Sequence, residues 1–235
     1  MSASHRWSSG NQQPTLFRTR RNDVLKVNEI FHSIQGESSH TGFPCVFVRL
    51  TGCNLRCTYC DTKYAYRKGR NMSVEEINKL VSRYECPLVE ITGGEPLLQE
   101  ETPKLAQDIS ERGCQVLVET NGTQNISLLP SGIICIVDIK CPGSGESEKT
   151  DWENLDRLGT QDQVKFVLTE KSDYTWAKEV IRSHHLTDRV TVHLSPAHGK
   201  LTPSELAHWI LEDGLNVRLQ LQLHKILWPN EDRGR

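Results

Sequence analysis

The chain has 235 residues, of which 36% are hydrophobic and 25% charged, and its formal net charge is −2 at pH 7. These values are ordinary for a globular protein of one large domain or two small ones. The balanced charge gives no support for broad affinity for nucleic acids or an anionic membrane surface. No apolar run reaches the ~18 residues of a membrane span, and the N-terminus lacks the apolar core of a secretory signal. We therefore expect a cytoplasmic protein without nucleic-acid or membrane partners.

Both ends of the chain differ in composition from its middle. Residues 1–22 are polar, serine-rich and basic with little to bury, so we predict a flexible N-terminal tail. Residues 229–235 are similar and are predicted to form a C-terminal tail. Residues 23–228 show no internal repeat and no sign of a second core, so we expect a single domain there.

Between these tails, short β-branched or apolar runs alternate with amphipathic stretches. The expected strands are Val24–Ile30, Cys45–Leu50, Leu88–Thr92, Gln115–Thr120, Ile133–Ile139, Val164–Thr169, Val190–Leu194 and Val217–Leu223. The expected helices are Ser73–Tyr84, Glu100–Gly113, Trp152–Leu158, Ser172–His184 and Thr202–Gly214. Two of these helices begin with the pattern of a capping box, Ser73 before Glu76 and Thr202 before Glu205.

Alternating strands and helices predict βα units around a parallel sheet. The pattern contains about six such units, fewer than the eight of a complete (β/α) barrel. The predicted fold is therefore α/β, a shortened and open (β/α)6-type barrel. Functional groups in such folds gather at the C-terminal ends of the strands, where this sequence places its polar and glycine-rich motifs.

Three of the eight cysteines lie within eight positions, directly after the strand that ends at Leu50. Cys53, Cys57 and Cys60 have the spacing C-x3-C-x2-C. Three thiolates can hold a [4Fe–4S] cluster and leave one iron without a protein ligand. S-adenosylmethionine (SAM) can bind that open iron, and one electron from the cluster then cleaves its C–S bond to give a 5′-deoxyadenosyl radical. The spacing resembles that of the radical SAM superfamily, in which the position of Tyr59 lies near the adenine.

Two alternatives bear on the cysteines. A structural zinc site usually has four ligands, commonly as two C-x2-C pairs, and this chain has no second pair; Cys86, His32 or His40 would have to complete it. Disulfides are the other alternative. However, the remaining thiols lie singly in or beside apolar runs, which is typical of buried cysteines in a reducing cytosol: they are Cys45, Cys86, Cys114, Cys135 and Cys141.

Polar motifs follow three further predicted strands. Gly93-Gly94-Glu95-Pro96 ends one strand, where glycines permit close approach of the backbone to a ligand. In the superfamily this motif meets the amino group of SAM. Glu119 and Asn121 end the next strand, either as ligand contacts or as an ordinary turn. Asp138-Ile139-Lys140 ends the third, either at the site or as a surface ion pair.

Together these segments resemble one family closely, the 7-carboxy-7-deazaguanine synthases. The resemblance runs from about residue 24 to residue 228 and rests on His32-Ser-Ile-Gln-Gly-Glu37, Phe47-Val-Arg-Leu-Thr-Gly-Cys53, Cys60-Asp-Thr62, Gly93-Gly-Glu-Pro96, Glu119-Thr-Asn-Gly122 and Val217-Arg-Leu-Gln-Leu-Gln-Leu-His-Lys225. It implies radical ring contraction of 6-carboxy-5,6,7,8-tetrahydropterin with loss of ammonia, in queuosine and 7-deazapurine biosynthesis. It also implies Mg²⁺, a homodimer and an external electron donor of the flavodoxin or ferredoxin type.

The resemblance also implies the substrate site. Arg49 is a lone charge on an apolar strand, and a buried arginine needs an anion, either the substrate carboxylate or a structural partner. Gln35 and Glu37 suit the donor and acceptor edge of a pterin. His224 ends a predicted strand, as a structural donor or a substrate contact. The implied substrate-binding residues are Ile34, Gln35, Gly36, Arg49 and Thr92, and the implied catalytic residues are Arg49, Glu37 and His224.

The cofactor contacts are implied in the same way. Thr62 would bind Mg²⁺ through its hydroxyl oxygen, a hard ligand, although a threonine there could instead cap a helix or turn. The residues implied to contact SAM are Tyr59, Cys60, Asp61, Gly94, Glu95, Asp138, Ile139 and Lys140. Many relatives have Ser-Pro-Lys where this chain has Asp138-Ile139-Lys140.

Other functions are compatible with part of the pattern. A radical SAM activase, which makes a glycyl radical on a partner enzyme, shares the cysteine and glycine motifs, but it would leave Gln35, Arg49 and His224 without a purpose. A non-catalytic zinc-binding module is a further hypothesis, which a brown protein with about four irons per chain after anaerobic purification would exclude.

Overall fold

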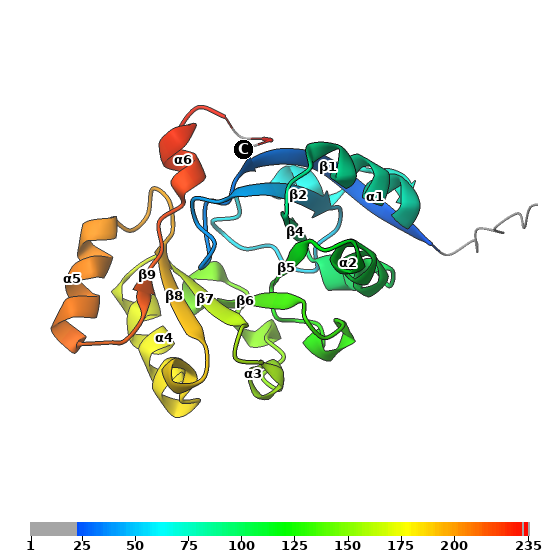
Figure 1. Cartoon of the computed structure of the whole chain (residues 1–235). Coiled ribbons are helices and arrows are strands. Elements are labelled where there is room, and N and C mark those ends of the chain that lie inside the picture. Colours follow the sequence, from blue (N-terminus) through cyan, green and yellow to red (C-terminus); the bar gives the residue numbers. More distant parts are fainter. Residues whose placement is uncertain (1–22, 232, 235) are drawn as a thin grey trace, which may run out of the picture.

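A curved nine-stranded sheet organises the structure, a computed structural model that describes residues 23–231, 233 and 234 (Figure 1). The N-terminal tail predicted over residues 1–22 lies outside these described residues. The strands are β1 (Val24–Ile34), β2 (Pro44–Leu50), β3 (Arg70–Ser73), β4 (Leu88–Gly93), β5 (Gln115–Thr120), β6 (Ile134–Lys140), β7 (Gln163–Leu168), β8 (Thr191–Pro196) and β9 (Arg218–Leu219). Their order in the sheet is β3-β1-β2-β4-β5-β6-β7-β8-β9.

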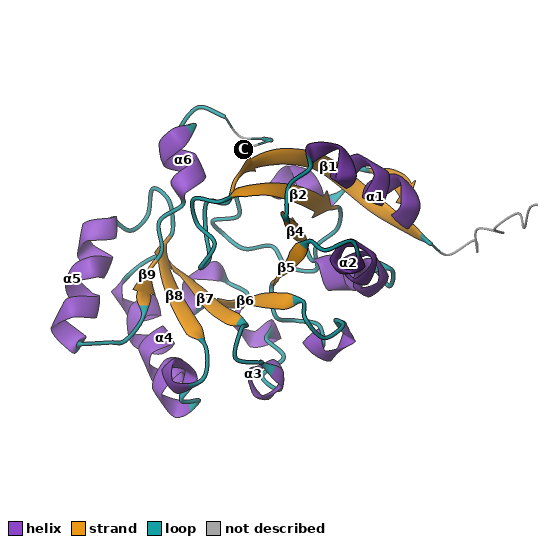
Figure 2. Cartoon of the chain, in the orientation of Figure 1, coloured by secondary structure: helices purple, strands orange, loops and turns teal. Residues whose placement is uncertain are grey.

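Most of the sheet is parallel, as predicted. From β2 through β4 to β9, neighbouring strands pair in parallel. The order has two free ends, so the barrel is open, which confirms the predicted fold class. The helices are α1 (Val74–Val81), α2 (Thr102–Glu111), α3 (Asn154–Arg157), α4 (Lys171–Ser183), α5 (Pro203–Asp213) and α6 (Leu223–Leu227). Figure 2 shows α2 to α5 outside the curve of the sheet.

Both predicted capping boxes are present. Ser73 accepts a hydrogen bond from the backbone of Glu76, whose carboxylate accepts one from the backbone of Ser73. Thr202 and Glu205 make the same pair of bonds at the start of α5. Side chains thereby satisfy amides that a helix leaves without partners at its N-terminus. None of the helices that the structure describes is both long and apolar enough to traverse a membrane.

The first strands depart from the predicted βα alternation. β1 pairs antiparallel with β2 and with the short strand β3, which the sequence pattern did not indicate. Only residues 35–43 connect β1 to β2, too few for the crossover that parallel strands require. The register of β1 on β2 shifts between Val27 and Glu29, and this bulge places Glu29 directly opposite Arg49.

The predicted strand Val217–Leu223 is wrong in its length. Only Arg218 and Leu219 pair with β8, and the chain then leaves the sheet and forms α6. The alternating leucines do not face a core, because Leu219 and Leu221 are 39% and 37% exposed. His224 therefore lies in the first turn of α6, not at the end of a strand.

Two apolar clusters lie between the sheet and its helices. One joins β1, β2, β4 and β5 to α1 and α2, and the other joins β6, β7 and β8 to α4 and α5. Because side chains alternate along a strand, the residues between these apolar positions point to the concave side of the sheet. They include Glu90, Glu119, Asp138 and Lys165.

Candidate active site

A cavity of about 420 Å³ opens at the C-terminal ends of the parallel strands. This is the end at which open α/β sheets and barrels carry their sites. All but two of the residues predicted for the site line it. They are Ile34, Gln35, Gly36, Glu37, Arg49, Cys53, Cys57, Tyr59, Cys60, Asp61, Thr62, Thr92, Gly94, Asp138, Lys140 and His224.

The side chains of two predicted cofactor contacts do not reach the cavity. Glu95 is fully buried, and its carboxylate already accepts hydrogen bonds from the backbone of Leu97 (2.9 Å), the backbone of Asn121 (2.7 Å) and the hydroxyl of Thr120 (2.8 Å). It therefore ties the end of β4 to the end of β5. Ile139 is also fully buried and belongs to an apolar cluster, because strand alternation turns it away from the face of its neighbours.

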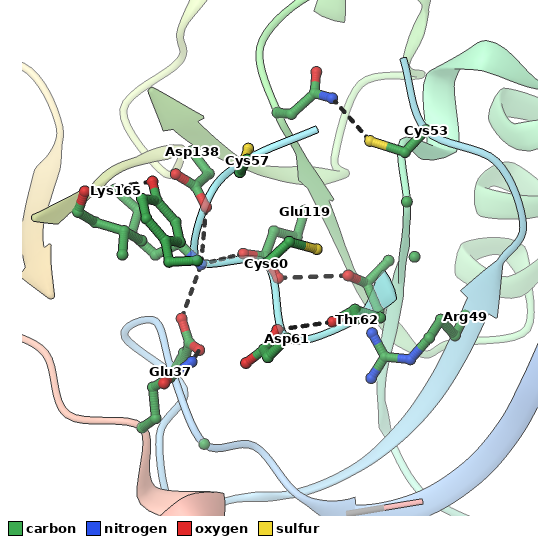
Figure 3. A pocket seen from close by; sticks show the side chains of 18 of the residues that line it. Glu37, Arg49, Cys53, Cys57, Cys60, Asp61, Thr62, Glu119, Asp138 and Lys165 are labelled. Carbon is green, nitrogen blue, oxygen red and sulfur yellow. Dashed lines mark hydrogen bonds and ion pairs between the residues drawn. The ribbon is translucent and has the colours of Figure 1, made fainter. Parts of the chain in front are cut away.

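The three cysteines of the motif form one wall of the cavity (Figure 3). Among the residues that the structure describes, no three His, Cys, Asp or Glu side chains converge closely enough for a single metal ion. Burial raises the pKa of Cys57 to about 11 and also raises the pKa of Cys53, so both thiolates need a cation, which cluster irons would supply.

The glycine motif packs directly against this wall. A Cβ atom on Gly94 would lie 2.0 Å from the carbonyl oxygen of Gly52 and 2.7 Å from Cβ of Cys53. Gly93 has a φ of +147°, and a Cβ atom on Gly93 would lie similarly close to the backbone of Leu50. Only glycine permits these contacts, so the motif lets the end of β4 approach the cysteine loop.

Arg49 lies on the opposite side of the view from Lys165 in Figure 3. Its Nε donates to Glu29 at 2.9 Å, and the hydroxyl of Tyr64 donates to the same carboxylate oxygen at 3.0 Å. The structural partner considered for Arg49 is therefore present. It uses Nε alone, and the guanidinium is directed toward Asp61 and Thr62 at the cavity.

A buried network of charges centred on Lys165 forms a further wall. Its Nζ lies 2.8 Å from Glu37 and 3.4 Å from Asp138, and it also bonds to Glu119 (Figure 3). The Lys165 side chain is only 7% exposed. Burial alone would raise the pKa of Glu37, but the charge and hydrogen bond of Lys165 lower it to about 2. Glu37 is therefore a carboxylate at neutral pH.

Asp138 also binds Lys140, at 2.7 Å. This contact uses the Oδ2 atom that faces Lys165, whereas Oδ1 is buried without a partner among the described residues. A buried acceptor that borders a cavity needs a donor from a ligand or water. The ion pair considered for Asp138 and Lys140 exists, but at the cavity and not on the surface.

Gln35 and Glu90, which also line the cavity, extend this network. The Gln35 amide donates to Glu90, and its carbonyl oxygen accepts from the backbone of Glu37 at 3.0 Å. Burial raises the pKa of Glu90 to about 8, with help from the neighbouring charge of Glu119. Glu90 is thus largely protonated at neutral pH, close to the ionised Glu37.

The segment before α6 crosses from the end of β9 to the loop that connects β1 and β2. The amide of Gln222 donates to Glu37 at 2.8 Å, and the backbone of Leu223 donates to the carbonyl oxygen of Gly36 at 3.0 Å. A Cβ on Gly36 would lie 2.2 Å from Nδ1 of His224, so the glycine makes room for that ring. Burial lowers the pKa of His224, which favours a neutral imidazole at the cavity.

Asp61 and Thr62 lie where the cysteine loop meets α6. Lys225 Nζ is 2.6 Å from Asp61 Oδ2, and the Thr62 hydroxyl donates to Asp61 Oδ1 at 2.9 Å. Thr62 occupies the N-cap position of the 3-10 helix η1 (Lys63–Tyr66), but its side chain makes no capping hydrogen bond. The hydroxyl oxygen can therefore still accept or coordinate.

Several cavity residues were not selected from the sequence, among them Glu90, Lys165, Gln222 and Lys225. A signal existed for the first two, because each is a lone charge in an apolar strand, the feature that singled out Arg49. Gln222 and Lys225 lie in the segment 217–225 that contributes to the family resemblance, but their places in the cavity depend on the path of the chain after β9.

Comparison with known proteins agrees with this geometry. The model of the radical SAM superfamily matches residues 47–130, which contain the cysteine and glycine motifs. Two relatives are called 7-carboxy-7-deazaguanine synthase. The one from Koribacter versatilis (strain Ellin345) is 45% identical over 225 residues, covering 89% of this chain and 100% of the relative. The one from Chlorobaculum tepidum is 42% identical, and the match covers 89% of this chain and 97% of the relative.

The fold is also similar to that of a solved structure. The crystal structure of QueE from Escherichia coli matches with a TM-score of 0.72 at 24% sequence identity, covering 86% of this chain and 95% of that chain. This likeness supports the open radical SAM barrel described above.

Proposed function

This chain belongs to the 7-carboxy-7-deazaguanine synthase family of radical SAM enzymes, and on that premise we propose a reaction for its cavity. The enzyme is a carbon–nitrogen lyase that converts 6-carboxy-5,6,7,8-tetrahydropterin to 7-carboxy-7-deazaguanine and ammonia, in queuosine or 7-deazapurine biosynthesis. One observation carries the proposal: a single cavity is bounded by three thiols, by an arginine and by a buried cluster of carboxylates. These groups match the cofactor, the carboxylate and the N–H edge of the pterin respectively.

The cysteine wall would hold the cofactors. Cys53, Cys57 and Cys60 would hold the [4Fe–4S] cluster, and SAM would lie between them and Asp138. When bound, this pair supplies a 5′-deoxyadenosyl radical that takes a hydrogen atom from the pterin carbon bearing the carboxylate. The free Oδ1 of Asp138 can accept a hydrogen bond from the amino group or a ribose hydroxyl of SAM. The close packing of Gly94 on the cysteine loop leaves backbone groups next to that position.

Arg49 would bind the substrate carboxylate. Glu29 accepts a hydrogen bond from Nε of Arg49 and is itself held by the hydroxyl of Tyr64, so the arginine side chain is already oriented before a ligand arrives. A guanidinium fixed in this way can present its remaining N–H groups to two carboxylate oxygens. This contact would orient the reacting carbon, which carries that carboxylate.

Lys165 would act on the opposite edge of the pterin through its partners. A 2-amino-4-oxo ring presents N–H donors, which need ionised and fixed acceptors. Lys165 keeps Glu37 ionised and holds it together with Glu119 at the cavity. Gln35 and Glu90 fix the backbone of Glu37 from below. Thr92 adds a weak hydrogen bond to Glu119 at 3.5 Å.

Thr62 would bind Mg²⁺. Its hydroxyl lies at the cavity beside Asp61 and is not used for capping. Mg²⁺ commonly keeps several waters and takes few protein ligands besides substrate oxygens. The charge of the ion would help Arg49 to orient the carboxylate, because the arginine guanidinium is directed toward Thr62 (Figure 3).

The segment that carries His224 would shield the reaction from water. It crosses from the end of β9 to the loop at Gly36 and is held there by Leu223 and Gln222. The neutral His224 ring can accept or donate a hydrogen bond to the substrate.

We also infer the partners from the family. The cluster must be reduced before it can cleave SAM, so an external carrier of the flavodoxin or ferredoxin type is expected. We expect a homodimer in the cytoplasm, and the eight free thiols are compatible with a reducing compartment. An activase role is not favoured, because the relatives at 40–45% identity share the synthase name.

An anaerobic assay tests the reaction. Reconstituted full chain is mixed with SAM, reductant, Mg²⁺ and 6-carboxy-5,6,7,8-tetrahydropterin, and product is measured by mass spectrometry together with ammonia. Formation of both in equal amounts is expected. Cleavage of SAM without consumption of the pterin would overturn the proposed substrate.

A further inference from the structure

A second concavity, of about 320 Å³, lies outside the cysteine loop. Its lining consists of five basic residues and two tyrosines, without an acidic side chain: Arg56, Lys63, Tyr64, Tyr66, Arg67, Lys68 and Arg233. Within residues 23–231, 233 and 234, no ion pair engages any of the five basic groups. All five side chains are exposed. In a chain of net charge −2, this basic surface is a local excess of one sign.

The basic surface is the outer side of the wall that holds the three thiols. Arg56 stands between Cys53 and Cys57 in the sequence, and its Nη1 donates to the carbonyl oxygen of Cys53 at 2.9 Å. The guanidinium of Arg56 lies 4.3 Å from the centre of the Tyr66 ring. Tyr66 itself lines both the cysteine cavity and the basic surface. A partner docked on the basic surface would therefore be separated from a cluster in the cysteine cavity by a single layer of residues.

The C-terminal segment completes this surface. Arg233 stacks on the ring of Tyr64 at 4.2 Å, which returns the end of the chain to the loop that follows β2 (Figure 1). Tyr64 also donates to Glu29, the partner of Arg49. Arg233 is far away in the sequence from the other four basic residues, which all belong to the loop that follows β2, and it adds a fifth positive charge to their surface.

We propose that this basic surface is the docking site of an acidic one-electron carrier protein that reduces the cluster. The inference rests on the proposed function, because only a cluster that must be reduced needs such a partner. Electron-transfer complexes are small and transient, and they are steered by complementary charge. Tyrosine and arginine are also enriched in protein interfaces. In the step, one electron leaves the reduced carrier and enters the cluster, and no bond forms or breaks.

Charge reversal tests the proposal without touching the cavity. The variant Arg67→Glu/Lys68→Glu changes two exposed residues that take no part in the cysteine wall, and Lys79→Glu/Arg83→Glu is the matched control on the outer helical layer. Reconstituted full chains are mixed with a reduced, acidic bacterial flavodoxin, and the bleaching of the cluster is followed by stopped flow from low to high salt.

At low salt we expect the second-order rate to fall at least ~10-fold in the Arg67/Lys68 variant and to stay unchanged in the control, because steering by complementary charge accounts for such factors. The salt dependence should flatten only in the Arg67/Lys68 variant. Arg233→Ala should lower the rate by less, since it removes one charge. Equal rates and equal salt dependence in all variants would overturn the docking site.

Chemical reduction separates this proposal from the proposed function. With dithionite, the Arg67/Lys68 variant should load the same iron and form the same amount of product as the wild type. If no pterin is converted with either reductant, the proposed function fails, whatever the docking rates. If product forms and flavodoxin reduces every variant alike, only the docking site fails.

Discussion

Two walls of the same cavity hold their functional groups in different ways. The cysteine wall is one short loop, with three thiols in eight positions and glycines packed behind it. The Lys165 wall combines charges from a loop and three strands, residues 37, 119, 138 and 165, that are far apart in the sequence. The thiolates of the first need a metal to offset their burial, whereas the carboxylates of the second are already offset by Lys165. Substitutions in the cysteine wall should therefore cause loss of a cofactor. Substitutions in the Lys165 wall should leave buried charges without their partners.

The largest effect is expected at Cys57. The substitution Cys57→Ala removes one of three iron ligands, so cluster loading and formation of 5′-deoxyadenosine should both be lost. Iron content and chromatography of the nucleoside check this. Cys86→Ala is the matched control, because this thiol lies outside the cavity, with carbonyl oxygens of Pro44 and Leu88 as its partners. Loss of iron in both variants would contradict the distinction between the walls.

The next effect is expected at Lys165. The substitution Lys165→Met leaves Glu37, Glu119 and Asp138 without their shared cation, which should destabilise the fold by about 3 kcal/mol and lower pterin turnover at least ~100-fold. Iron loading and SAM binding should persist. Kinetics with pterin and SAM measure the loss of turnover, and thermal unfolding measures the loss of stability, so the two effects can be separated.

Two variants control for this result. Lys165→Arg should recover part of the turnover, because it restores the charge. Lys178→Met removes a lysine paired with Asp213 outside the cavity and should leave turnover unchanged. If Lys165→Met keeps the pterin turnover of the wild type, the positioning role of Lys165 is wrong.

Arg49 should have an intermediate effect. The substitution Arg49→Ala removes a charged contact to the carboxylate, worth about 1.5–3 kcal/mol, so the KM of the carboxypterin should rise roughly 10- to 100-fold. Iron loading should be spared, because Arg49 is not on the cysteine wall. Binding of tetrahydropterin, which lacks the carboxylate, should change little. Full turnover in Arg49→Ala would remove the carboxylate assignment.

The smallest effect concerns pH. Glu90 keeps its proton up to about pH 8 in the folded chain, against an ordinary value of 4.5. Between these values the folded state binds more protons than the unfolded state. The contribution of Glu90 to stability is therefore complete below pH 4.5 and is lost as pH rises through 8, with a limiting slope of about 1.4 kcal/mol per unit.

The substitution Glu90→Gln removes the titratable group, so the loss of stability with rising pH should become less steep. Its melting temperature relative to the wild type should rise from pH 6 to pH 8, measured by scanning fluorimetry. The exposed Glu179→Gln on α4 serves as control and should run parallel to the wild type. Parallel curves for Glu90→Gln as well would show that Glu90 does not hold a proton in the folded chain.

The sequence by itself determined the parts that are local. The cysteine spacing, the glycine turn, both capping boxes and most strands of the open barrel were predictable, because each depends on neighbours within a few residues. The lone charge in the apolar strand β2 was also enough to single out Arg49. The antiparallel start of the sheet could have been anticipated only from the short connection between β1 and β2.

Only the tertiary structure decided which groups meet. It saturates Glu95 with three donors, turns Ile139 into the core and ends β9 after two residues, so that His224 lies on a helix. It also brings Lys165 to its carboxylates and Arg233 to the cysteine loop. Such contacts depend on how strands curve and where the chain crosses between them, and no short stretch of residues encodes that.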